Sequence, residues 1–118
     1  MARKKLSLDD AGDIACALPG VVESTSYGTR SWKVGRKFLM REKERMDNVV
    51  VIVTDSVDEQ EFLIERDCDV YFITDHYRGY PAVLVRLAKI DRNTLAAHLE
   101  RAWRARATKK QIAAYDAR

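Results

Sequence analysis

Hydrophobic and polar residues follow two different periods along this chain, and the period predicts which stretches are helical and which are extended. The first apolar set has the spacing of one helix face and comprises Leu8, Ala11, Ile14, Ala15 and Leu18. This spacing predicts an amphipathic helix, which Ser7 begins as a capping box with Asp10. The helix ends at Pro19 and Gly20. Residues 21–28 follow as a polar connector whose hydroxyl groups favour a turn.

The next stretch predicts extended structure. Residues 30–41 read as a β-hairpin because Gly35 and Arg36 separate two runs of aromatic and aliphatic residues. Residues 42–47 form a charged turn, and residues 48–54 form a continuous run rich in β-branched side chains. A run of that kind is typical of a strand near the centre of a sheet.

The register of this first hairpin has two solutions. Glycine at the first turn position favours a two-residue type II′ turn, which sets Trp32 opposite Leu39. The apolar alternation alone fits a three-residue loop, which sets Val34 opposite Phe38. We expect the two-residue turn.

The second half of the chain predicts two helices around another hairpin. Asp55 or Ser56 begins a short helix that extends to residue 65. A second hairpin pairs residues 70–74 with residues 82–87 around a seven-residue loop. Asp91 begins a last long helix, whose core-facing stripe comprises Leu95, Leu99, Ala102 and Trp103. Residues 105–110 loosen that helix, and residues 111–115 add a short helical turn.

The predicted order is α-β-β-β-α-β-β-α, which indicates an α+β fold with a mainly antiparallel five-stranded sheet packed by helices. The chain has 118 residues, 47% of them apolar and 33% charged, so we expect residues 1–118 to form a single domain. No apolar run is long enough to span a membrane, and the charged start lacks the apolar core of a signal peptide. We therefore expect a cytoplasmic monomer.

The residues that carry chemistry are few. The two histidines are His76, beside Asp75 in the second hairpin loop, and His98, which falls off the apolar stripe and is expected at the surface. The cysteines, Cys16 and Cys68, lack a metal or redox spacing and are expected as free thiols. No metal set, phosphate-binding glycine loop or nucleophile–base pair is recognisable. We expect no enzyme activity, no cofactor and no bound metal.

Charge is distributed unevenly along the chain. The net charge is +3, but residues 46–75 carry nine acidic residues and one arginine, whereas residues 76–118 carry ten Lys and Arg against three acids. Residues 1–45 are also basic. Either each third is an ordinary solvated surface, or the basic thirds meet on one face that binds a polyanion.

The two hairpin tips concentrate the candidate binding groups. Lys33, Arg36 and Lys37 cluster at the first tip, and His76 and Arg78 lie at the second, where Tyr77 and Tyr80 could stack or form hydrogen bonds. The aromatic and charged side chains of the second loop show no pattern that would place them in a hydrophobic core.

Three stretches resemble one known family. LPGVVESTSYGTRSWKVGRKF, VYFITDHYRGYPAVLVRL and AWRARATKK occur in order between Leu18 and Lys110 and resemble the MmcQ/YjbR-like proteins. The resemblance implies a fold similar to secretion chaperones and frataxin-type domains. It also implies DNA binding through two wings, which would be the two hairpins. The binding residues expected on this basis are Arg30, Lys33, Arg36, Lys37, His76, Tyr77, Arg78, Arg104, Lys109 and Lys110.

Two functions remain open at this stage. The first is a non-enzymatic DNA-binding domain whose basic tips contact phosphates. The alternative is a protein- or peptide-binding module with a chaperone-like fold and no nucleic-acid role, anchored by Tyr77 and Tyr80. Because Asp75 and the acidic segment before it repel phosphate, the position of Arg78 relative to these carboxylates matters for the first function.

Overall fold

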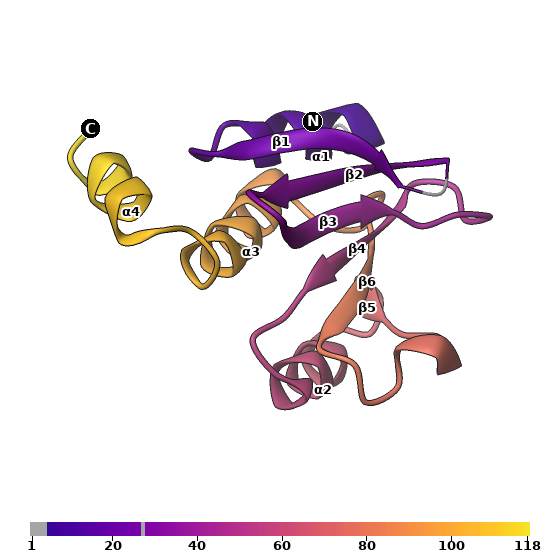
Figure 1. The fold of residues 1–118 in the computed structure, drawn as a ribbon. Coiled ribbons are helices and arrows are strands. Elements are labelled where there is room, and N and C mark those ends of the chain that lie inside the picture. The colour runs from indigo at the N-terminus through magenta and orange to yellow at the C-terminus, as the bar shows by residue number, and fades with distance from the viewer. Residues whose placement is uncertain (1–4, 27) are drawn as a thin grey trace, which may run out of the picture.

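One antiparallel sheet organises the computed structural model, which describes residues 5–26 and 28–118 (Figure 1). Arg3 and Lys4 of the basic first third lie outside the described residues. Within them the sheet has six strands in the order β1-β2-β3-β4-β6-β5. Their bounds are β1 Val21–Ser26, β2 Thr29–Val34, β3 Lys37–Glu42, β4 Val49–Val53, β5 Tyr71–Phe72 and β6 Ala82–Arg86. The α+β class is confirmed, whereas the predicted five strands are corrected to six.

The central strands β4 and β6 are buried on both faces, as the continuous β-branched run indicated. Val50 and Ile52 of β4 join the larger core on the side of the helices. Val49 and Val51 point to the opposite face and belong to a smaller cluster with Leu84 of β6. Successive side chains of a strand point to opposite faces of the sheet. A strand that is covered on both faces can therefore be apolar at every position.

Three helices cover one face of the sheet and share its larger core (Figure 1). α1 Leu8–Cys16 begins with the predicted capping box, and the Ser7 side chain accepts a hydrogen bond from the Asp10 backbone. α2 Val57–Arg66 begins at Ser56. α3 Arg92–Arg104 begins at Asp91 and buries its whole predicted stripe. Local capping chemistry therefore fixed all three helix starts.

Residues 21–28 are not a connector, which corrects the prediction for this stretch. Six of them form β1, which pairs antiparallel with β2 from Val21 opposite Val34 to Ser26 opposite Thr29. β1 lies at the edge of the sheet, where polar side chains can face solvent while the backbone pairs on one side. The Ser and Thr residues of this strand are typical of turns, and for this reason the sequence pattern predicted a connector.

The first hairpin has the predicted two-residue turn but a different register above it. Val34 lies opposite Lys37, as a turn at Gly35 and Arg36 requires. The register then shifts, so that Trp32 lies opposite Met40 rather than opposite Leu39. A β-bulge of this kind adds one residue to one strand. Because of this bulge, the hairpin keeps the two-residue turn at Gly35 and Arg36 and also buries both Leu39 and Met40.

The second hairpin and the chain end also differ from the prediction. β5 has only two residues, and a single 3₁₀ turn, η1 Asp75–Tyr77, interrupts the loop that follows. Beyond α3, helix α4 Lys109–Asp116 is longer than the expected short turn and begins with a capping box between Thr108 and Gln111. His98, expected at the surface, is 2% exposed.

Candidate functional site

The turn between β2 and β3 presents the first group of predicted binding residues. Gly35 has a φ angle of 63°, a conformation that glycine adopts without strain. Arg36 and Lys37 after it are exposed, and Lys33 on β2 is half-buried. Within the described residues none of these three cations forms an ion pair with a carboxylate. Their charges remain available to an anionic partner.

The second loop folds back onto the sheet, and this corrects the expectation for Tyr77. The Tyr77 side chain is 4% exposed and packs on the smaller core cluster of Val49, Val51, Ala82 and Leu84. Arg41 of β3 donates a hydrogen bond to the Tyr77 hydroxyl, and its guanidinium lies 5.9 Å from the centre of the ring. Tyr77 thus anchors the loop to β3.

A buried glutamine holds the same loop from the other side. Gln60 of α2 is 1% exposed, and its Nε2 amide donates to the backbone carbonyls of Tyr77, Tyr80 and Ala82 at 3.0, 2.6 and 2.6 Å. The two hydrogens of this NH2 group are shared among the three carbonyls, and those of Tyr77 and Tyr80 also accept from the backbone N–H groups of Tyr80 and Ala82. The loop between η1 and β6 is therefore fixed at both ends.

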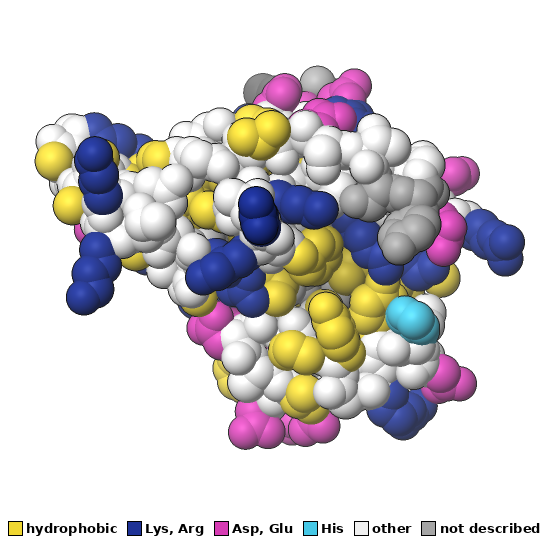
Figure 2. Space-filling model, viewed as in Figure 1, with side chains coloured by type: hydrophobic (Ala, Val, Ile, Leu, Met, Phe, Trp, Pro, Cys, Tyr) yellow, Lys and Arg dark blue, Asp and Glu magenta, His cyan; other side chains and the backbone are white. Residues whose placement is uncertain are grey.

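Together β3 and this loop line two adjoining surface compartments. A narrow compartment of about 230 Å³ is lined by Phe38, Arg41, His76, Tyr77 and Tyr80. A wider compartment of about 560 Å³ is lined by Lys37, Phe38, Val53, Asp55, Tyr80, Pro81, Ala105 and Arg106. Phe38 and Tyr80 line both compartments, so we refer to these two lists together as the aromatic groove. Figure 2 shows hydrophobic side chains in a hollow, with Lys and Arg along its rim.

The rings of the aromatic groove differ in exposure. Tyr80 is 52% exposed and His76 is also exposed, while Tyr77 is buried beneath them. The Tyr77 and Tyr80 rings are 6.1 Å apart with an interplanar angle of 68°, and the His76 and Tyr77 rings are 5.0 Å apart at 82°. These edge-to-face contacts leave faces of the outer rings open to a planar ligand.

The charges of the aromatic groove are mainly positive. Lys37 and Arg106 lie in the wider compartment and Arg41 in the narrow one, against the single carboxylate of Asp55 among its described lining residues. Arg106 donates to the Ala102 carbonyl at 3.0 Å, and partial burial lowers its pKa, which still leaves it protonated at neutral pH. The first and last basic thirds of the chain therefore meet in this groove.

Arg30 lies outside the aromatic groove and is already paired. Its guanidinium contacts Asp9 at 2.6 Å and Glu23 at 2.8 Å and lies 5.1 Å from the Trp32 ring. The hydrogen bonds to Glu23 and Asp9 raise the pKa of Arg30, and the bond from Arg30 lowers the pKa of Glu23. This predicted binding residue joins α1, β1 and β2.

Arg78 is exposed but does not project free of the acidic residues. Its guanidinium pairs with Asp75 at 2.9 Å, and both side chains are open to solvent. Surface pairs of this kind contribute little to stability, so an incoming phosphate could displace the carboxylate at small cost. Asp75 binds Arg78 and not His76, whose ring contacts Tyr77 instead.

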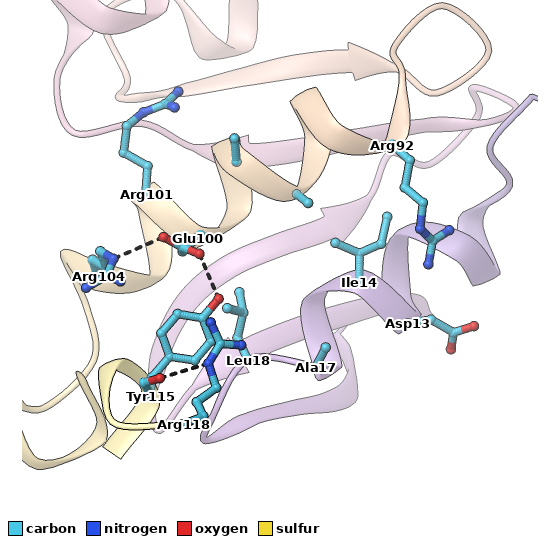
Figure 3. Close-up of a pocket in the computed structure, with 12 residues that line it drawn as sticks. Asp13, Ile14, Ala17, Leu18, Arg92, Glu100, Arg101, Arg104, Tyr115 and Arg118 are labelled. Atoms are coloured by element: carbon cyan, nitrogen blue, oxygen red, sulfur yellow. Dashed lines mark hydrogen bonds and ion pairs between the residues drawn. The ribbon is translucent and has the colours of Figure 1, made fainter. Parts of the chain in front are cut away.

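The C-terminal cations surround a separate cleft between α1, α3 and α4 (Figure 3). Arg104 contacts Glu100 at 3.2 Å and Asp116 at 2.7 Å, and the Asp116 bond is the main cause of the raised pKa of Arg104. The Tyr115 hydroxyl donates to Glu100 at 2.7 Å, which lowers the pKa of that carboxyl. Arg104 therefore ties α4 to α3. Lys109 and Lys110 are exposed on α4.

Sequence reasoning placed Lys37, His76, Tyr77 and Tyr80 in the site but missed three of the other residues that line it. Phe38, Arg41 and Arg106 come from a strand and a helix end, where their pattern indicated only sheet pairing or surface charge. Gln60 carries no sequence signal because it lies in an acidic helix segment. The unusual length of the loop at residues 75–81 was the one available indication that it covers something.

Other classes of site find no support in the part of the chain that the structure describes. No group of three His, Cys, Asp or Glu side chains there is placed to hold a metal ion. Cys16 and Cys68 are exposed free thiols. Among the same residues, none of the helices combines the length and the apolar character needed to cross a bilayer.

Comparisons with known proteins give one family. The model of the YjbR family matches residues 16–105. Uncharacterized proteins of Mycobacterium bovis and Mycobacterium tuberculosis are 34% identical over 123 aligned residues, covering 91% of this chain and 93% of each relative. No solved structure matches the chain. The matched range contains the β2–β3 turn and the loop at residues 75–81, whereas Lys109 and Lys110 lie beyond it.

Proposed function

This chain belongs to the YjbR family, and we propose that it is a non-enzymatic DNA-binding protein that uses the β2–β3 turn and the aromatic groove. The observation that carries the proposal is the juxtaposition of cations and open aromatic rings. Arg36 and Lys37 lack a carboxylate partner among the described residues, and Lys37 shares the groove with Tyr80. Cations bind phosphates and exposed rings bind bases, so the surface offers both contacts that nucleic acid requires.

The binding mode differs from two projecting wings. The β2–β3 turn supplies the phosphate contacts, and the loop at residues 75–81 supplies rings on a fixed backbone. Arg78 contributes only after it leaves Asp75, and Arg30 and Arg104 keep their structural ion pairs.

The test is the affinity of the purified chain for fluorescein-labelled DNA, duplex and single-stranded, by fluorescence anisotropy from roughly 50 to 200 mM salt. The double variant Arg36→Glu with Lys37→Glu should bind more weakly and reduce the salt slope by roughly two units, because about one unit belongs to each phosphate contact. The matched control is Lys89→Glu with Arg92→Glu, the same charge change at exposed positions at the other end of β6.

Two results would count against DNA binding. One is the absence of any binding at roughly 50 mM salt, where a few phosphate contacts remain detectable. The other is equal weakening by both double variants, which would indicate a response to total charge rather than to the β2–β3 turn.

The alternative is a peptide-binding module at the same groove. Val53, Pro81 and Ala105 give the wider compartment an apolar lining that suits a peptide side chain as well as a base. Apolar anchoring depends little on salt, so a protein partner that stays bound at high salt and is lost on Tyr80→Ala would favour this alternative over DNA.

A further inference from the structure

We propose that the narrow compartment of the aromatic groove takes one unpaired nucleobase, so that the protein prefers single-stranded nucleic acid to duplex. This inference rests on the proposed function and specifies its ligand. Three observations support it: the exposure of the rings, the rigidity of the loop and the size of the compartment.

The rings that a base would contact are the exposed ones. Half-buried Phe38 from β3 and exposed Tyr80 from the loop line both compartments, and exposed His76 lines the narrow one. Tyr80 is among the three large hydrophobic side chains that are more than half exposed within the described residues. A stacked base covers such a ring whatever its sequence, because every base has a π-face.

The loop that carries Tyr80 is already ordered. Gln60 holds the carbonyls on both sides of Gly79, and the buried Tyr77 ring supports Tyr80 edge-on at 6.1 Å. Since a ligand need not order the ring or its backbone, little of the stacking free energy is lost on binding.

The dimensions select an unpaired base. The narrow compartment, about 230 Å³, is smaller than the pockets of roughly 300–1,000 Å³ that take drug-sized ligands. A single base enters it, whereas a base inside a duplex is stacked and paired and must first be extruded. Arg41 already donates to the Tyr77 hydroxyl and has further guanidinium N–H groups for the acceptors on a base edge.

The wider compartment suits the adjoining backbone of the strand. Lys37 and Arg106 line it, and it shares Phe38 and Tyr80 with the narrow compartment beside it. Asp55 is its one carboxylate among the described lining residues. A strand whose base stacks on Tyr80 therefore places its next phosphates beside two cations, which a free aromatic metabolite would not use.

The experiment compares three fluorescein-labelled DNAs of equal length: oligo-dT, the same backbone with abasic sites, and a duplex. Oligo-dT should bind about tenfold more tightly than the abasic strand, because the abasic strand lacks the base that stacks on the rings and accepts from Arg41. Tyr80→Ala should lower oligo-dT affinity towards that of the abasic strand and leave abasic binding unchanged. Tyr80→Phe, which keeps the ring, should retain oligo-dT affinity.

Phe62→Ala is the matched control, because Phe62 is an exposed ring on α2 that does not line the groove. It should leave all three affinities unchanged. Far-ultraviolet circular dichroism shows whether each variant is folded, and Tyr80→Phe keeps the test decisive should Tyr80→Ala unfold.

The outcomes separate this inference from the proposed function. Equal binding of oligo-dT, abasic strand and duplex that Tyr80→Ala leaves unchanged overturns the base site but leaves phosphate binding in place. Tighter binding of duplex than of oligo-dT also overturns it. Failure of all three DNAs to bind overturns both. A preference for oligo-dT that depends on the ring at position 80 supports the inference.

Discussion

Gly12 lies inside α1 against the indole ring of Trp32. A Cβ at this position would lie 2.7 Å from Cζ2 of Trp32, closer than packed carbon atoms approach one another. Trp32 is fully buried and cannot move aside. Glycine weakens a helix interior, and this close packing explains why the helix contains one.

Gly12→Ala should therefore destabilise the protein, although helix propensity alone favours alanine by about 1 kcal/mol. We expect a loss of about 1–3 kcal/mol from overpacking, measured by urea unfolding followed by circular dichroism. Asp13→Ala on the exposed side of the same helix is the control and should change stability little. A Gly12→Ala protein more stable than wild type would contradict the packing argument.

His98 should make stability depend on pH. Burial, and secondarily the charge of Arg101, lowers its pKa to about 4, while Glu59 and the Val53 carbonyl act in the opposite direction. The unfolded chain has the ordinary histidine pKa of about 6.5 and binds the proton more readily. Stability is therefore complete above pH 6.5 and falls as the pH drops towards 4, by up to about 3 kcal/mol.

The measurement is urea unfolding at pH 7, 6, 5 and 4.5. His98→Gln should flatten the pH dependence, whereas His76→Gln, which removes an exposed imidazole, should keep it. A wild-type stability that stays constant between pH 6.5 and 4.5 would show that His98 does not contribute this term.

At the scale of elements, one helix positions a loop that lies far from it in sequence. Gln60 on α2 bonds three carbonyls between η1 and β6, and Arg41 on β3 bonds Tyr77 from the other side. The loop is thus anchored to the folded core through Tyr77 and is not a free tip. Its function depends on α2 as much as on its own residues.

Gln60→Leu should loosen this loop. The substitution removes the side-chain donor from three carbonyls, of which those of Tyr77 and Tyr80 keep a backbone N–H donor, so we expect a loss of about 1 kcal/mol. Amide hydrogen exchange should increase at residues 75–81, and DNA affinity should fall with it. Glu61→Leu is the control, since the neighbouring Glu61 is exposed. Unchanged exchange at residues 75–81 in Gln60→Leu would mean that the amide does not hold the loop.

Across the face seen in Figure 2, Lys and Arg lie around the hollow, whereas Asp and Glu lie mainly towards the periphery. Some of these acidic side chains are at the end of the molecule where α2 lies in Figure 1, and others are at the opposite end. The large exposed hydrophobic residues, Val22, Phe62 and Tyr80, lie on three different segments. Their distribution over separate segments favours a monomer, because a stable homodimer buries a contiguous apolar patch.

The chain should consequently be a monomer. Light scattering after size-exclusion chromatography should give the mass of one 13.5 kDa chain across a range of concentrations. A mass twice this value that persists on dilution would contradict the expectation and direct attention to the open edge of β1.

Sequence alone determined the features that depend on neighbours along the chain. Ser7, Ser56 and Asp91 fixed the helix starts by bonding backbone amides three residues away, and Gly35 fixed the β2–β3 turn. The continuous apolar run of β4 identified the centre of the sheet. Each of these signals depends on a few neighbouring residues, so it can be recognised in the sequence without knowledge of the fold.

Only the tertiary structure decided which distant residues meet. The edge strand β1, the bulge that pairs Trp32 with Met40, and the buried positions of Tyr77 and His98 all follow from contacts across the sheet. The aromatic groove likewise joins β3, the loop at residues 75–81 and the end of α3. The spacing of apolar residues along the sequence indicates which face of its own helix or strand a residue occupies. Packing between elements decides whether that face is buried.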